Sequence, residues 1–128
     1  MGAGIILVVD DEPQLIRLVS RYLERLGYDV VSAGNTAGAW ALLEGEPRSF
    51  ALVMIDVTMA QPSGEELAWR ILSSRPQVHV VLSSGYAADL ANIEQAFPGR
   101  VSFLQKPFSG DMLAQTVERI LGAPPHGE

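Results

Sequence analysis

Five short apolar runs spread along the chain constrain its fold more than any other feature. Three of them end directly before charged residues, which follow as Asp10-Asp11 after residues 5–9, Asp56 after residues 51–55 and Lys106 after residues 101–105. Apolar runs of this length, separated by helical patterns, predict parallel strands that are buried on both faces. Parallel strands bring their carboxyl ends to one edge of a sheet, where open α/β folds bind ligands. We therefore expect these charged residues to be neighbours in space.

The residue types at this edge indicate a particular chemistry. Three carboxylates held close together repel one another unless a cation lies among them, and carboxylate oxygens are ligands that suit Mg²⁺. A lysine beside the same carboxylates indicates that an anion binds there as well. The interpretation is a Mg²⁺ and phosphoryl site.

The segments between the apolar runs carry helical patterns. Apolar residues recur at helical spacing over residues 13–26, and Gly27 ends that pattern. Strands are predicted over residues 5–9, 28–33, 51–55, 78–82 and 101–104, and helices over residues 13–26, 36–43, 65–73, 87–97 and 111–121, the last with Ser109 as N-cap. Alternating strands and helices predict an α/β fold in which right-handed crossovers place helices on both sides of a parallel sheet.

Composition limits the class of protein further. The chain has 128 residues, of which 48% are apolar and 19% charged, which is typical of one soluble globular domain. We expect a core at residues 4–121 and a flexible tail at residues 122–128. The absence of cysteine excludes disulfides and thiolate metal sites. The net charge of −6 and the scattered basic residues argue against direct nucleic-acid binding.

No apolar run approaches the about 20 residues that a membrane helix requires. The N-terminus also lacks a basic region followed by a long apolar stretch, the pattern of a secretory signal. We therefore expect a cytoplasmic protein that does not span a membrane.

Each charged motif taken alone also fits an ordinary structural role. Asp10-Asp11-Glu12-Pro13 suits the start of a helix, where acids interact favourably with the macrodipole and proline fits the first turn. A lone Asp56 could cap a loop, and Lys106-Pro107-Phe108 could form a surface turn. The combination of the three motifs is far more specific than any one of them.

That combination resembles a receiver domain of the two-component response-regulator family, over residues 4–121. The matching elements are Val8-Val9-Asp10-Asp11-Glu12-Pro13, Asp56 followed by Met59 and Gly64, Leu82-Ser83-Ser84-Gly85, and Phe103-Leu104-Gln105-Lys106-Pro107-Phe108. The resemblance implies one (βα)5 flavodoxin-like domain with three layers and the strand order 2-1-3-4-5.

The resemblance also implies a role for each site residue. Asp56 would be the phosphoacceptor, and Mg²⁺ would bind to Asp11, Asp56 and the carbonyl of Thr58, with Asp10 assisting through water. Lys106 would contact the phosphoryl group, and a cis bond before Pro107 would direct Lys106 into the site. Ser84 would sense the phosphoryl group through its hydroxyl, and Phe103 would be the aromatic switch.

Three positions depart from the family's usual pattern or compete for a role. Ser83 and Ser84 both offer a hydroxyl, and Ser84 is preferred because it lies 22 residues before Lys106 and directly before Gly85, so that Ser83 would point to the other face of its strand. Ala60 follows Met59 where the family often has proline, which leaves the shape of that loop open. Phe103 replaces the commoner tyrosine and has no hydroxyl.

The resemblance implies a signalling module and not an enzyme with its own substrate. Its partners would be a sensor histidine kinase or a histidine phosphotransfer protein, and a downstream effector protein, and the chain would be a monomer or a phosphorylation-dependent dimer. Two alternatives stay open. The chain could be the receiver fragment of a hybrid histidine kinase or a phosphorelay intermediate, or, from another class, a Mg²⁺-dependent phosphatase with an aspartyl nucleophile.

Other conspicuous residues have simpler interpretations. His79 and His126 have no partner at the spacing of metal ligands, so neither is expected to bind a metal or to act as a phosphohistidine. Trp40 and Trp69 are expected to anchor helices against the sheet. Tyr86 lies near the expected mouth of the site, where it could pack on a helix or shield the phosphoryl group from water.

Overall fold

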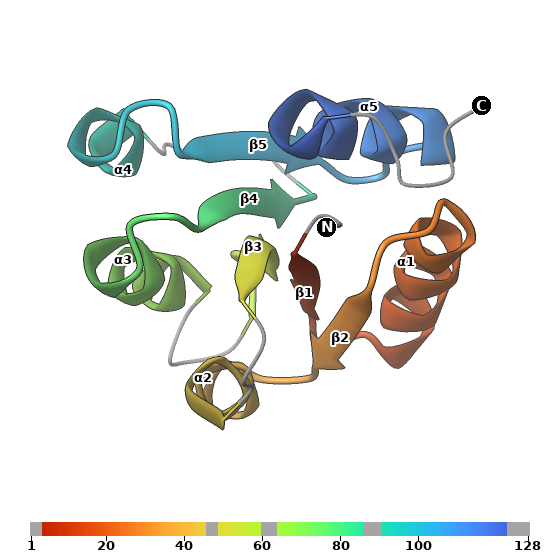
Figure 1. The fold of residues 1–128 in the computed structure, drawn as a ribbon, viewed down its shortest axis with the longest axis horizontal. Helices are drawn as coiled ribbons and strands as arrows, with labels where there is room; N and C mark the ends of the chain where they lie inside the picture. Colours follow the sequence, from red (N-terminus) through yellow and green to blue (C-terminus); the bar gives the residue numbers. More distant parts are fainter. Residues whose placement is uncertain (1–3, 46–48, 60–63, 86–90, 123–128) are drawn as a thin grey trace.

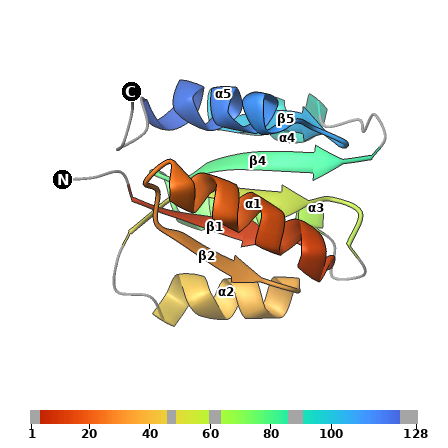
Figure 2. The ribbon, with the colours of Figure 1, turned by 90° about the vertical axis from the view of Figure 1, so that its right-hand side faces the viewer.

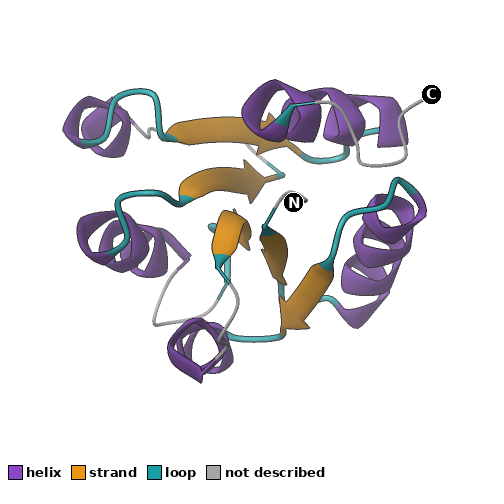
Figure 3. Ribbon diagram, in the orientation of Figure 1, coloured by secondary structure: helices purple, strands orange, loops and turns teal. Residues whose placement is uncertain are grey.

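The structure is a computed structural model that describes residues 4–45, 49–59, 64–85 and 91–122. It has five strands: β1 (Ile5–Val9), β2 (Val30–Ala33), β3 (Phe50–Asp56), β4 (His79–Ser84) and β5 (Val101–Gln105). Five helices alternate with them: α1 (Pro13–Arg25), α2 (Thr36–Gly45), α3 (Gly64–Ser74), α4 (Ala91–Ala96) and α5 (Gly110–Leu121). The strands form one parallel sheet in the order β2-β1-β3-β4-β5, which confirms the predicted fold (Figures 1 and 3).

Helices cover both faces of this sheet. Helices α1 and α5 lie on one side of the strands, and α2, α3 and α4 lie on the other (Figure 1). Side chains alternate between the two faces along each strand. Val53 and Ile55 therefore belong to the apolar cluster beneath α2, α3 and α4, whereas Leu52 and Met54 belong to the cluster beneath α1 and α5. All five strands point the same way, so their carboxyl ends share one edge (Figure 2).

Several element boundaries differ from the predicted ones, and two of the differences affect the site. Strand β3 includes Asp56 and strand β4 extends to Ser84, so both residues are the last in their strands and not the first in a loop. Strand β2 begins at Val30 instead of Tyr28, because the Tyr28 N–H donates to the Leu23 carbonyl and belongs to the end of α1.

Other predictions of local structure can be compared directly with the described residues. Ser109 is the N-cap of α5, where its hydroxyl accepts from the Met112 N–H, as predicted. The helix predicted over residues 87–97 appears as α4 from Ala91, since residues 86–90 lie outside the described part of the chain. Among the described helices, none combines the length and apolar character needed to cross a membrane.

Gly64 allows α3 to begin directly against the carboxyl end of β3. A Cβ atom at this position would lie 2.3 Å from the Asp56 carbonyl oxygen and 2.8 Å from Ile55 Cγ2, both shorter than a real Cβ contact. Only a residue without a side chain leaves room for the backbone of Asp56 here. Gly64 therefore helps to place Asp56 at the edge of the sheet.

We expect Gly64→Ala to lower the free energy of unfolding by about 1–3 kcal/mol, because the new methyl group must displace the backbone of β3 or of α3. Denaturant unfolding measures the change. Gly34→Ala is the matched control, since a Cβ at Gly34 meets nothing within 4 Å and Gly34 is not among the glycines with positive φ. Equal stability of the two variants would contradict the close approach.

Candidate functional site

Two aspartates at the carboxyl edge are held by the same local turn. Asp10 follows β1, and its Oδ1 accepts from the N–H of Glu12 at 2.9 Å. Asp56 ends β3, and its Oδ1 accepts from the N–H of Thr58 at 2.9 Å and from the Thr58 hydroxyl at 2.7 Å. An aspartate that bonds the N–H two residues on is the defining contact of an Asx turn. In both residues the turn engages one carboxylate oxygen and leaves Oδ2 to face the site.

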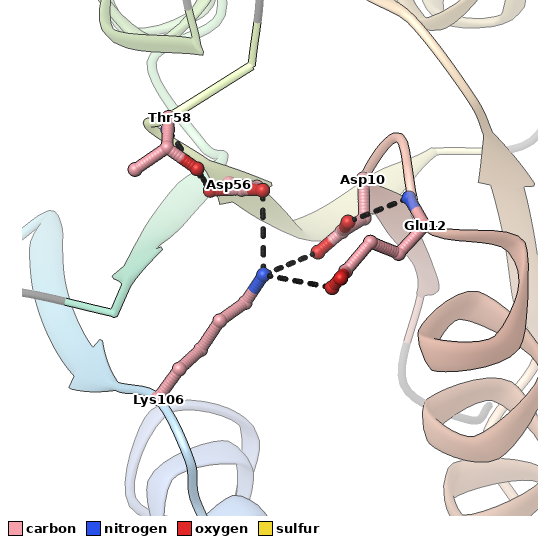
Figure 4. A network of polar contacts seen from close by, with 5 residues as sticks. All are labelled: Asp10, Glu12, Asp56, Thr58 and Lys106. Atoms are coloured by element: carbon pink, nitrogen blue, oxygen red, sulfur yellow. Dashed lines mark hydrogen bonds and ion pairs between the residues drawn. The ribbon is translucent and has the colours of Figure 1, made fainter.

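Lys106 contacts both of these Oδ2 atoms from the carboxyl end of another strand of the sheet. It follows β5, and its Nζ lies 3.0 Å from Asp10 Oδ2 and 3.3 Å from Asp56 Oδ2 (Figure 4). Glu12 Oε1 is a third, more distant partner at 3.6 Å. Asp10 and Asp56 are buried, and the Lys106 side chain is 18% exposed. Charged residues from β1, β3 and β5 therefore meet at one point, as the sequence predicts for neighbouring strand ends.

Burial and charge act against each other on the pKa values of this group. Burial raises the pKa of Asp10 above its ordinary value, and the hydrogen bonds from Glu12 and Lys106 only partly offset it, while the charge of Asp56 adds to the increase. For Lys106, burial alone would lower the pKa, but the contacts with Asp10 and Asp56 outweigh burial and raise it. The ammonium group therefore stays charged, and the ionised Asp10 is the unfavourable member of the cluster.

The acids also form a group that could hold a metal ion. One carboxylate oxygen from each of Asp10, Asp11 and Asp56 lies within 4.8 Å of the others. Asp11 is exposed while the other two are buried, so the group opens to solvent on one side. A set of oxygen donors with room for water suits Mg²⁺, which keeps several of its waters when it binds to proteins. The donor set thus fits the expected ion.

Thr58 takes part in the site through a contact that the sequence interpretation missed. The expectation concerned its carbonyl as a metal ligand, whereas the described contacts are those of its N–H and hydroxyl with Asp56. The spacing of a threonine two residues after an aspartate could have indicated the turn, because this is the spacing of an Asx turn. The hydroxyl adds a donor that a backbone turn alone would not provide.

The two serines of β4 occupy different positions relative to Asp56. Ser83 is paired in register with Asp56 on one side and with Leu104 on the other, and Ser84 is paired with Gln105. Alternation therefore places Ser83 on the same face of the sheet as Asp56 and Ser84 on the opposite face. Among the described residues, nothing accepts from or donates to the buried Ser83 hydroxyl. The register of β3 with β4 therefore makes Ser83 a competitor of Ser84 for the role of phosphoryl sensor.

Four other residues that the sequence singles out, which are Pro107, Phe103, Trp40 and Trp69, can also be located. The Lys106–Pro107 peptide bond is cis, the isomer that the family resemblance implies. Phe103 is half-buried and packs against the cluster beneath α2, α3 and α4, as do Trp40 and Trp69. The Trp69 ring meets the Phe97 ring edge-on, with centroids 5.4 Å apart, which fits the predicted anchoring role.

His79 is the first residue of β4 and lies at the opposite end of that strand from Ser84. His79 Nε2 lies 3.0 Å from Ser102 Oγ, and burial, with the nearby Arg100 and Arg119, lowers the His79 pKa. A half-buried histidine that stays neutral is consistent with a structural role. Tyr86, Ala60 and His126 lie outside the described residues.

A five-stranded parallel α/β sheet with a lysine and an acidic cluster at its carboxyl edge is the architecture that the resemblance to a receiver domain predicts, and the sequence comparison agrees. Residues 6–118 match the family model of the response regulator receiver domain, so the chain belongs to that family. The response regulator receiver protein CpdR of Brucella abortus is 32% identical, with 91% of this chain aligned to 95% of that protein.

Other relatives are longer or have solved structures. The chain is 31% identical to the transcriptional regulator NtrC of Azospirillum brasilense, with 96% of this chain covered but only 25% of that protein. The solved structure of the response regulator TrrA of Thermotoga maritima, in complex with Mg²⁺–BeF, has a TM-score of 0.78 and 28% identity, over 92% of this chain and 99% of that chain. Similar domains therefore occur both alone and within longer proteins.

Mg²⁺ should raise the melting temperature of the wild type, because a cation offsets the repulsion among the three acids. Asp10→Asn should raise the melting temperature of the metal-free protein by roughly 2–5 °C and reduce the further gain from Mg²⁺. The sign follows from the pKa of Asp10, since a carboxyl with a raised folded-state pKa costs stability once the pH exceeds that pKa.

Differential scanning fluorimetry with and without Mg²⁺ measures both changes. Asp111→Asn is the control, because Asp111 is exposed in the first turn of α5 and is not a member of the acidic cluster, so the substitution removes the same charge from outside that cluster. Identical melting temperatures for all three proteins, with and without Mg²⁺, would show that the acids do not interact.

Proposed function

We propose that this chain is the phosphoacceptor domain of a two-component system and that Asp56 receives the phosphoryl group. The observation that carries the proposal is the ammonium group of Lys106 held between Asp10 Oδ2 and Asp56 Oδ2, at 3.0 and 3.3 Å. Phosphoryl transfer depends mainly on alignment and on neutralising negative charge. A lysine already in contact with the acceptor carboxylate would provide part of that neutralisation without a large rearrangement.

The donor would be a phosphohistidine on a sensor histidine kinase or on a histidine phosphotransfer protein. An oxygen of Asp56 forms the new O–P bond while the P–N bond to the donor histidine breaks, and the product is an acyl phosphate. Thr58 holds Asp56 Oδ1 through two hydrogen bonds, which fixes the plane of the carboxylate before transfer. Lys106 moves its contact to the transferred phosphoryl oxygens. Hydrolysis of the acyl phosphate later restores Asp56 and releases inorganic phosphate.

Mg²⁺ is the proposed cofactor. Asp11, Asp56 and the Thr58 carbonyl would hold it directly, and Asp10 would assist through water. The ion supplies positive charge for the phosphoryl oxygens during transfer. The support is the acidic group within 4.8 Å and the Mg²⁺–BeF complex of the related TrrA.

The output is proposed to be a change in the surface formed by α4, β5 and α5. Ser84 and Lys106 would bond the phosphoryl oxygens and draw the end of β4 inward, which makes room for Phe103 to rotate. A downstream effector protein would bind the changed surface, and the chain would act as a monomer or as a phosphorylation-dependent dimer in the cytoplasm.

Two alternatives lead to different experiments. The chain could be one receiver of a hybrid histidine kinase or a phosphorelay intermediate, and the length of the full gene product would decide. An aspartyl-nucleophile phosphatase is disfavoured, because such enzymes typically carry a second acid two residues after the nucleophile, where this chain has Thr58 bonded to Asp56. Turnover of a small phosphomonoester would favour the phosphatase.

The first functional test is the site of labelling. With acetyl phosphate and Mg²⁺, the wild type should gain one phosphoryl group at Asp56, and Asp56→Asn should gain none, because the amide cannot form the acyl phosphate. Lys106→Ala should label more slowly. Asp111→Asn is the control and should label like the wild type. Mass spectrometry locates the phosphoryl group, and stoichiometric labelling of Asp56→Asn would exclude Asp56 as the acceptor.

The second test decides between the two serines. Beryllofluoride imitates the phosphoryl group, and NMR chemical shifts of residues 91–105 report the response of the surface. Ser84→Ala should bind the mimic but weaken the response, whereas Ser83→Ala should keep it. Ser83→Ala should also leave the protein equally or more stable, because it removes a buried hydroxyl without a described partner. A response to the mimic that is weakened in Ser83→Ala and kept in Ser84→Ala would assign the sensing role to Ser83.

A further inference from the structure

Glu12 sits between the start of α1 and Lys106. It is the N-cap residue of α1, its side chain is 66% exposed, and its Oε1 lies 3.6 Å from Lys106 Nζ (Figure 4). Both backbone polar groups of Glu12 are hydrogen-bonded, since its N–H donates to Asp10 Oδ1 and its carbonyl accepts from the Ile16 N–H. The position of Glu12 beside the site is therefore fixed by its backbone.

The direction of the Glu12 side chain is unusual for this position. A side-chain oxygen at an N-cap normally accepts from the first N–H groups of the helix, and an acid there also interacts favourably with the macrodipole. The Glu12 side chain makes no cap hydrogen bond. It reaches instead toward Lys106, which already contacts the buried Asp10 and Asp56. Glu12 is thus the one partner of Lys106 in Figure 4 that faces solvent.

This arrangement affects any anion that approaches Asp56. An incoming phosphoryl group must share Lys106, which is the only lysine in the sequence. Glu12 places a negative charge on the solvent side of that lysine, well within the Debye length of about 8 Å at physiological ionic strength. Repulsion from Glu12 grows with the negative charge of the donor.

We propose that Glu12 is a specificity-determining residue that disfavours phosphodonors of high negative charge. The inference rests on the proposed phosphoacceptor function of Asp56. Its consequence is that small dianionic donors label the chain more slowly than the acidic cluster and Lys106 alone would allow. Donors whose phosphoryl group carries a neutral or cationic leaving group, as a protonated phosphohistidine does, are affected less.

The test compares two small donors of different charge. Acetyl phosphate is a dianion at neutral pH, and phosphoramidate is less negative because its amino group is protonated. Glu12→Gln should speed labelling by acetyl phosphate about two- to fivefold, the range expected for one exposed charge interaction, and labelling by phosphoramidate by a smaller factor. Glu12→Lys should speed labelling by acetyl phosphate still more, so that the two donors differ more in the factor by which the substitution speeds labelling. This difference between the accelerations for the two donors should shrink at 1 M salt, where the Debye length is about 3 Å.

Glu24→Gln is the matched control. It removes the same charge from the same helix, and 12 helical residues at 1.5 Å each place it about 18 Å from Glu12, beyond the Debye length at physiological salt. Glu24 is exposed, so the substitution should change neither the ratio of the two labelling rates nor its dependence on salt.

Each result separates the inference from the function on which it rests. A ratio of rates that is the same in Glu12→Gln and the wild type, or a change that persists unaltered in high salt, overturns the role of Glu12 while labelling of the wild type at Asp56 upholds the proposed function. Absence of labelling in the wild type with both donors overturns both. A larger increase for acetyl phosphate that salt removes supports the inference.

Discussion

The contact of Lys106 with Asp10 and Asp56 is the interaction on which the rest of the site depends. It joins the ends of β1, β3 and β5, which are separated in sequence by up to 96 residues. Lys106 is the member that cannot be lost, because removing the only cation of a buried ion pair leaves both carboxylates buried without a partner, which typically costs about 3–5 kcal/mol. The sheet therefore has to keep these three strand ends in register, and the packing of its two apolar clusters serves that requirement.

The same contact also balances part of the negative charge at the carboxyl edge of the sheet. Without a metal ion, Lys106 provides the positive charge that the acids need, and the raised pKa of Lys106 reflects their attraction. A single ammonium group cannot neutralise Asp10, Asp11 and Asp56 together, which leaves the cluster negative and ready for a cation. Once a phosphoryl group is present, the lysine has a new partner, and the acids need another cation. In the proposed function, this count of charges is the reason why Mg²⁺ would be needed in addition to Lys106.

The sequence predicts the fold and the gathering of the charged residues, because both follow from where apolar runs end. Alternating patterns define five strands, and a parallel sheet brings Asp10, Asp56 and Lys106 to one edge without further information. It could not predict how individual carboxylate oxygens are used, because this depends on local turns. The Thr58 hydroxyl and the Glu12 carboxylate were missed for that reason. The competition between Ser83 and Ser84 depends on strand register, which becomes definite only once β4 is seen to extend to Ser84.

The paired Asx turns suggest why one carboxylate can be both rigid and reactive. In Asp10 and Asp56 alike, Oδ1 is held by donors two residues on, and Oδ2 contacts Lys106. The turn fixes the carboxylate plane, so Oδ2 is positioned without any contact from the incoming group. Such positioning would lower the entropic cost of the proposed transfer, since the acceptor need not be ordered during the reaction. Because Glu12 and Thr58 complete these two turns, they lie directly beside the carboxylates that a donor would approach in the proposed function. Variation at either position can therefore alter the kinetics of transfer while the acidic cluster and the lysine stay the same.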